Sequence, residues 1–156
     1  MRKNFNGTQI SQSVTITEQA GADIADCRNR IMIYDEDGNV VLAADGTKPL
    51  VGIALIEAGV NDISGAESGK VSKGDDVDIQ IKDIGYVIAG EDVAKGAEVT
   101  AGADGFAKSA AAGDHVLGLA LRGASKDGYL RVQVMKYQKG AQTASAGTDT
   151  PKEPTE

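Results

Sequence analysis

The sequence is poor in the residues from which most catalytic and metal sites are built. Its 156 residues include one cysteine, one histidine, no tryptophan and only 4% aromatic residues. The single cysteine, Cys27, cannot form an intramolecular disulfide bond, and His115 alone cannot supply a histidine-rich metal site. Asp114 precedes His115, but neighbouring side chains on a strand point to opposite faces, which disfavours a catalytic relay between them. The sequence therefore predicts a protein that is not an enzyme and carries no cofactor.

Clustered positive charge and long apolar runs are also missing. The chain has 16 Lys and Arg against 23 Asp and Glu, a net charge of -7, and its basic residues are scattered. Binding to phosphates requires clustered cations, and binding to single strands requires aromatic stacking surfaces. No segment approaches the roughly 18 apolar residues of a membrane span, and the first residues lack the apolar core of a signal peptide. We expect no nucleic-acid partner, no membrane partner and no secretion.

Two segments have some features of ligand-binding loops but depart from their patterns. Residues 65–71 have one residue too few between the glycines of a phosphate loop, and Val71 stands where the metal-binding hydroxyl belongs. In residues 35–46, glycine comes at the fourth position of a calcium loop instead of the sixth, and Gly46 replaces the glutamate at the twelfth. We interpret both segments, and the charged residues 73–76, as solvated turns.

Glycine and alternating apolar segments are abundant. The 20 glycines include four Asp-Gly pairs, at residues 37–38, 45–46, 104–105 and 127–128, and this pair tolerates the positive φ of tight turns. Apolar and polar residues alternate most clearly over residues 77–82, the pattern of a half-buried antiparallel strand. Residues 20–30 carry apolar side chains at helical spacing and predict a single helical turn. The other predicted strands begin near Val14 and cover residues 31–34, 40–43, 50–56, 86–89, 98–101, 106–109, 116–121 and 130–137.

The chain also resembles itself. Val-Gly-Ile-Ala-Leu at residues 51–55 returns 66 residues later as Leu-Gly-Leu-Ala-Leu, and residues 77–81 return 53 residues later as 130–134. These offsets place an insertion of about 13 residues between the last two strands of the first copy. Two copies are too few for a solenoid, so we expect them to close one barrel or sandwich. Gly52 and Gly118, in mid-strand, mark matching bends or close approaches of the backbone.

These patterns divide the chain into three parts. Residues 1–12 form a polar, extended N-terminal arm, residues 13–139 a β-rich domain duplicated over about 28–82 and 94–135, and residues 140–156 a tail of disordered type. The predicted fold class is all-β, a small antiparallel β-barrel or sandwich built from two related halves.

Several of these segments together resemble one known family. They are the opening Lys3-Asn4-Phe5, residues 14–17, the two Gly-aliphatic-Ala-Leu segments, residues 93–99 leading to 103–105, and the closing strand 130–134. Over residues 1–137 the chain is similar to the small head-decoration, or capsid cement, proteins of tailed bacteriophages. The resemblance implies an accessory protein, often a homotrimer, that is made in the host cytoplasm, sits on the capsid exterior of the virion and reinforces the major capsid protein without doing chemistry. Residues 26–29 depart from the more Gly-Asp-Pro-like turn of similar proteins, so the first copy matches less closely than the second.

The N-terminal arm is the segment expected to contact the capsid. It is too polar to pack as core, yet Arg2, Lys3, Asn4 and Phe5 offer two cations, an amide and an apolar anchor to a partner surface. The alternative function is a β-rich binding or carrier-like module, since residues 88–97 resemble the hairpins of biotinyl or lipoyl carrier domains and of β-clip proteins. A carrier would need Lys95 at the tip of a hairpin, and the match stops at Gly96.

Overall fold

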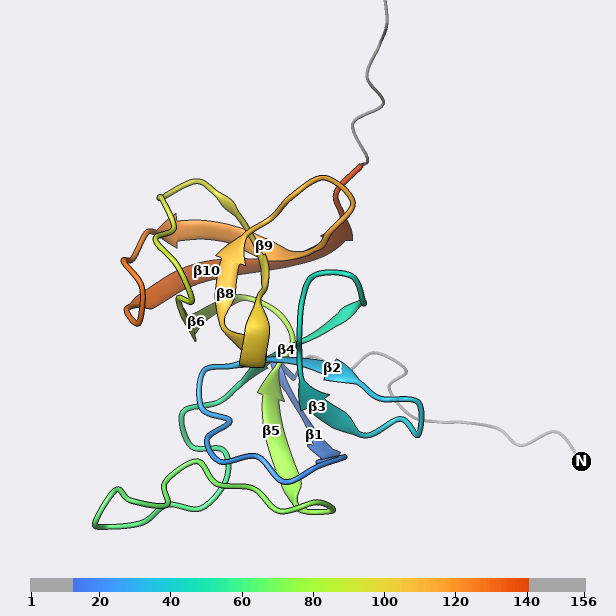
Figure 1. Ribbon diagram of the computed structural model, residues 1–156, viewed down its shortest axis with the longest axis vertical. Coiled ribbons are helices and arrows are strands. Elements are labelled where there is room, and N and C mark those ends of the chain that lie inside the picture. Colours follow the sequence, from blue (N-terminus) through green and yellow to red (C-terminus); the bar gives the residue numbers. More distant parts are fainter. Residues whose placement is uncertain (1–12, 141–156) are drawn as a thin grey trace, which may run out of the picture.

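The protein folds into two antiparallel five-stranded sheets, one formed by each half of the chain (Figure 1). The computed structural model describes residues 13–140. The predicted arm and nearly all of the predicted tail lie outside these residues. The first sheet contains β1 (Thr15–Gln19), β2 (Ile31–Tyr34), β3 (Val40–Leu42), β4 (Leu50–Ala54) and β5 (Asp76–Gln80). The second contains β6 (Ile84–Ile88), β7 (Glu98–Ala101), β8 (Ala107–Ser109), β9 (His115–Arg122) and β10 (Tyr129–Gln138), with a single 3₁₀ turn at Ala103–Gly105.

The all-β prediction is confirmed, and each predicted strand corresponds to an observed one. In β5 the alternation has the expected cause: Val77 and Ile79 are fully buried whereas Asp76 and Asp78 are exposed. The prediction left open a barrel or a sandwich, and the structure matches the sandwich, because two sheets pack against each other. Single parallel bridges, Ala20 to Val40 and Ala89 to Ala107, link the edges of each sheet without closing it into a barrel.

The two sheets share one strand order. The first runs β1-β5-β4-β2-β3 and the second runs β6-β10-β9-β7-β8, so each strand of the second sheet takes the place of the strand five earlier in the chain. Residue pairing corresponds as well: Thr17 opposite Asp78 becomes Tyr86 opposite Arg131, and Ile53 opposite Gln80 becomes Leu119 opposite Gln133. The halves are therefore related in topology and register. That they arose by duplication of one sequence stays a prediction.

Gly52 and Gly118 occupy equivalent positions for a shared steric reason. A Cβ atom at Gly52 would clash with the carbonyl oxygen of Gln80, and one at Gly118 would clash with that of Gln133. In each half the fourth strand thus approaches its neighbour too closely for any side chain, as expected of glycine within a strand.

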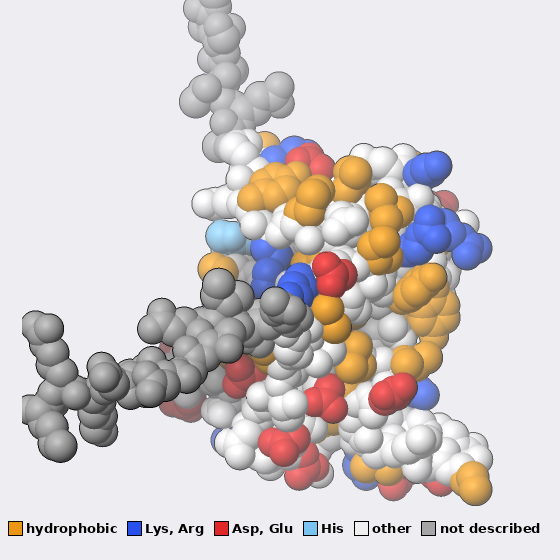
Figure 2. Space-filling model, turned by 180° about the vertical axis from the view of Figure 1, so that it is seen from behind, with side chains coloured by type: hydrophobic (Ala, Val, Ile, Leu, Met, Phe, Trp, Pro, Cys, Tyr) orange, Lys and Arg blue, Asp and Glu red, His pale blue; other side chains and the backbone are white. Residues whose placement is uncertain are grey.

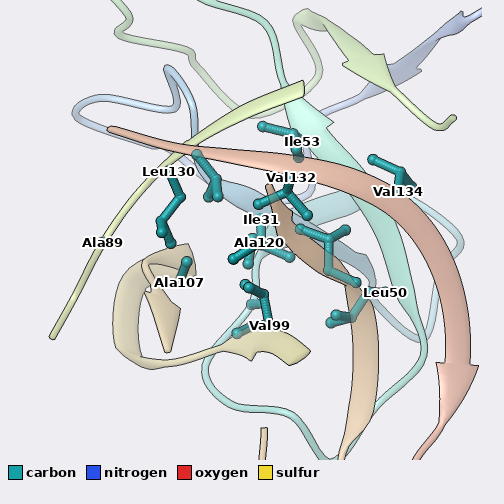
Figure 3. Close-up of a cluster of buried hydrophobic side chains, with 14 of the residues drawn as sticks. Ile31, Leu50, Ile53, Ala89, Val99, Ala107, Ala120, Leu130, Val132 and Val134 are labelled. Atoms are coloured by element: carbon teal, nitrogen blue, oxygen red, sulfur yellow. The ribbon is translucent and has the colours of Figure 1, made fainter. Parts of the chain in front are cut away.

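Strands β2 and β4 are buried on both faces. Met32, Val51 and Ala54 belong to a cluster inside the first half, whose other members include Val77 and Ile79. The alternate residues of the same two strands turn the other way and pack against the second half. Figure 3 shows this second cluster, in which Ile31, Leu50 and Ile53 meet Val99, Ala120, Leu130 and Val132. The apolar run at residues 50–54 is continuous because both of its faces are covered.

Polar groups fix the junction between the halves. Asn29 donates from Nδ2 to the carbonyl of Tyr86 at 2.9 Å, and the backbone carbonyl of Asn29 accepts from the N–H of Ile88 at 3.0 Å. The Arg30 guanidinium lies 3.4 Å from the centroid of the Phe106 ring, a cation–π contact. From β10, Lys136 donates to the carbonyl of Val51 at 2.7 Å. Burial lowers the pKa of both Arg30 and Lys136, because each cation gives up solvent to bridge the halves.

Two expectations of detail are wrong. Residues 20–30 contain no helical turn, because the N–H and carbonyl of Ile24 pair with the backbone of Val71 instead of with their own segment. The helical spacing arose because Ile24 and Cys27 are buried in an irregular loop. Asp45-Gly46 also differs from the other three Asp-Gly pairs, since neither of its residues has a positive φ. Gly46 is glycine because a Cβ would meet Thr100 and Asp114 of the second half. No helix within residues 13–140 is long and apolar enough to cross a membrane.

The steric role of the paired glycines gives a direct test. We expect Gly52→Ala and Gly118→Ala each to lower the free energy of unfolding by about 3 kcal/mol or more, because the backbone carbonyl that the new Cβ meets cannot move aside without breaking the sheet. Urea denaturation followed by circular dichroism measures this. Gly102→Ala is the control, since its Cβ would lie 3.5 Å from the nearest atom, and should change stability by less than about 1 kcal/mol. Equal effects at all three positions would contradict the close-approach assignment.

Candidate interaction surface

Cys27 and His115, the two residues considered for chemistry in the sequence, lie in different surroundings. Cys27 is fully buried in the loop between β1 and β2, where burial, and secondarily the nearby Asp26 carboxylate, raise the pKa of its thiol to about 11. His115 opens β9, and its N–H joins the halves by donating to the carbonyl of Gly46 at 2.7 Å. Its backbone carbonyl accepts from the Thr100 hydroxyl, within the second half, also at 2.7 Å.

The acidic turns are closed by their own backbone. Both Asp37 and Asn39 donate their N–H groups to the Asp35 carboxylate, at 3.0 and 2.9 Å. In the long loop between β4 and β5, the Ser68 hydroxyl and the Asp62 backbone bond to each other, which fills the interior of the segment that resembled a phosphate loop. Within residues 13–140, no group of three or more His, Cys, Asp or Glu side chains is placed to hold a metal ion.

Lys95 does not lie on a hairpin tip. It stands in the connection between β6 and β7, and these two strands do not pair with each other: β6 pairs with β10, and β7 with β8 and β9. The geometry required of a carrier lysine is therefore absent at Lys95.

The most distinctive surface is the outer side of β6 and β10, which we call the tyrosine face. Its six outward side chains are Ile84, Tyr86, Ile88, Tyr129, Arg131 and Gln133. Ile84, Tyr86 and Tyr129 each keep about half of their surface exposed, 49%, 49% and 50%. Farther along β10, Met135 and Tyr137 extend the exposed apolar surface, so three of the four tyrosines of the chain lie on this side of one sheet. Tyr, Met and Arg are the residues that protein interfaces favour.

Two arginines lie opposite each other on neighbouring strands of this sheet. Arg131 of β10 lies directly opposite Arg122 of β9, and both are exposed. Like charges opposite each other destabilise a sheet, and in the part of the chain that the structure describes neither arginine forms an ion pair. By contrast, the charge of Glu98 at the other end of the same sheet is balanced by an ion pair with Lys139 at 2.5 Å. Hydrogen bonds from Lys139 and then Tyr137 lower the pKa of Glu98 and keep it ionised. The arginine pair leaves positive charge beside the tyrosine face.

Charge divides sharply between the halves. Residues 13–82 hold 13 acidic and six basic side chains, whereas residues 83–140 hold seven of each. In Figure 2, hydrophobic side chains gather over the upper part of the molecule, where basic side chains also lie, and most of the visible acidic side chains lie over the lower part. The tyrosine face belongs to the neutral half, and the net charge of the described residues comes from the first half.

The predicted contact residues Arg2, Lys3, Asn4 and Phe5 lie outside the described residues, so their role stays a prediction. The tyrosine face was missed from the sequence because Tyr86 is 43 residues from Tyr129 in the chain, and only the pairing of β6 with β10 brings them together. One signal was available in the sequence. Four outward positions of β6 and β10 are apolar or aromatic where the matching positions of β1 and β5 are polar.

Geometry and chemistry together define an all-β protein with a surface of exposed tyrosine and isoleucine side chains. No family model and no curated protein sequence matches the chain. Among solved structures, it is similar to the N base of head fiber gp8.5 of bacteriophage phi29, with a TM-score of 0.55 and 22% sequence identity over 78% of this chain and 93% of that chain. This likeness shows a shared fold.

The burial of Cys27 predicts its reactivity. Iodoacetamide at about pH 8 should leave the folded protein unmodified, because the thiol is inaccessible and its raised pKa keeps it protonated. Intact-mass measurement is the readout, and the same reagent in guanidinium chloride is the control, where one adduct should form. Stoichiometric labelling of the folded protein would contradict the buried position of this thiol.

Proposed function

We propose that this protein is a non-enzymatic structural protein of a bacteriophage head, and more specifically a decoration, or cement, protein. In this proposal it binds the outer surface of the mature capsid as a homotrimer and stabilises the lattice of the major capsid protein. The observation that carries the proposal is the fold shared with a head fiber base, which spans 93% of that chain. The sequence resemblance to head-decoration proteins is independent support, because it rests on short motifs and not on the fold.

The surface chemistry is consistent with such a role. A decoration protein is held at high local density on the particle, where a net charge of -7 keeps neighbouring copies soluble by mutual repulsion. It also needs surfaces for two kinds of partner, the coat and its own copies. The arm and the tyrosine face are two separate candidates for these contacts.

In the proposal the N-terminal arm makes the coat contact. Its Arg2 and Lys3 would pair with acidic groups on the coat, while Phe5 would fill an apolar pocket and Asn4 would hydrogen-bond to exposed backbone. The arm precedes the first core residue, Ile16, which packs against the cluster inside the first half. Its removal therefore takes no described side chain out of the core.

Deletion of the arm tests the proposal. A variant lacking residues 2–12 should keep the melting temperature of the parent within about 2 °C, since the core is intact. It should no longer co-sediment with undecorated heads of the source phage, and the heads should lose their added thermal stability. Removal of residues 141–156 is the matched control and should leave head binding unchanged. Parental binding by the armless protein would show that the coat contact lies elsewhere.

Point substitutions separate the contributions within the arm. Arg2→Ala combined with Lys3→Ala should weaken head binding and reduce its dependence on salt, because two screened charge contacts are lost. Phe5→Ala should weaken binding without changing the salt dependence. Gln9→Ala serves as the control within the same segment. Unchanged affinity in both test variants would exclude these residues from the contact.

A further inference from the structure

The two halves provide an internal control for the tyrosine face. Because strand order and register are shared, each residue of this face has one counterpart on the outer side of β1 and β5. We call that counterpart surface the acidic face; its residues are Thr15, Thr17, Gln19, Asp76, Asp78 and Gln80. Four of these, Thr17, Gln19, Asp76 and Asp78, are exposed. The same backbone thus presents a polar, acidic surface in one half and an apolar, aromatic one in the other.

The comparison shows that the fold does not require apolar residues on the tyrosine face. Where the first half pairs Thr17 with Asp78, the second pairs Tyr86 with Arg131, and where the first pairs Gln19 with Asp76, the second pairs Ile88 with Tyr129. With either set, a five-residue first strand, β1 or β6, forms the same five residue pairs with its neighbour, β5 or β10. Polar residues at the positions of the exposed Ile and Tyr side chains would therefore support the second sheet equally well.

We propose that the tyrosine face binds the acidic face of a second copy of this chain. Charge selects this occupant, because Arg131 on the tyrosine face and Arg122 beside it form no ion pair within residues 13–140, and the acidic face carries Asp76 and Asp78. Asp78 accepts a hydrogen bond from the Thr17 hydroxyl, and no cation pairs with either aspartate in the described part of the chain. Docking would pair the arginines with these carboxylates and remove the tyrosines from water.

Such a contact is head-to-tail, since each copy offers one face from each half. Head-to-tail contacts repeat until a ring closes, so one interface is sufficient to build a cyclic oligomer. This inference rests on the homotrimer of the proposed function and supplies its contact. Self-association is measured in solution without heads, so its outcome is independent of whether the arm binds the coat.

Grafting the first-half residues onto the second half tests the apolar part of the interface. The triple variant Ile84→Thr, Tyr86→Thr, Ile88→Gln places on β6 the residues that β1 carries in the same register, so the sheet should form and the melting temperature should stay near that of the parent. Sedimentation equilibrium should show a trimeric parent and a monomeric variant, with the dissociation constant raised more than about tenfold.

Ile63→Ser is the matched control, because Ile63 is fully exposed in the loop between β4 and β5 and lies outside both faces. It should remain trimeric. A parent that is monomeric at every attainable concentration, or a folded triple variant that remains trimeric, would overturn the proposal.

Charge reversal tests the identity of the occupant. Arg131→Asp and Asp78→Arg exchange the residues that occupy equivalent positions in the two halves, and each alone should dissociate the trimer by placing like charges together. The double variant restores opposite charges at every interface of the ring and should reassemble. If Asp78→Arg leaves the trimer intact, or if the double variant stays monomeric while folded, the acidic face is not what the tyrosine face binds.

Discussion

The structure depends on two strands that are buried on both sides. One set of side chains on β2 and β4, with Met32 and Val51, completes the core of the first half, and the alternate set, with Ile31 and Ile53, completes the core of the second. An ordinary two-layer protein of this size would leave one face of each sheet polar. Here the first sheet is also a layer of the second half's core, so we expect the halves to unfold together despite their separate sheets.

The junction that this arrangement creates is polar at its rim. Arg30 stacks on Phe106 and donates to the Asp104 carbonyl at 3.0 Å, while its Nε is buried without a hydrogen-bond partner. Burying a cation with incomplete pairing costs stability. What it provides is orientation: a directional contact fixes how one half sits on the other, which apolar packing alone specifies weakly. The angle between the halves also sets the angle between the tyrosine and acidic faces, and hence the geometry of any assembly built from them.

The sequence predicted the scaffold well because the scaffold is governed by local rules. Alternation at residues 77–82 marked β5, and the matching glycines at 52 and 118 marked close approaches that the structure explains by the same carbonyl clash in both halves. Prediction failed where distant contacts decide. Ile24 and Cys27 looked helical because an irregular loop buries them, and the tyrosine face exists only through the pairing of β6 with β10. The contact predicted at residues 2–5 lies outside the described residues, so the structure does not test it.

The long connection between β4 and β5 has a practical consequence. The corresponding connection between β9 and β10 spans residues 123–128, whereas this one spans residues 55–75, and both reach equivalent backbone bridges, at Ala124 and Val71, five residues before the next strand. The extra residues of the β4–β5 connection therefore all precede Val71, and the pairing of β5 with its neighbours is unchanged by them. The chain contains its own demonstration that this site accepts extra length, which makes the exposed segment around Ile63 the natural place to graft a foreign peptide for display.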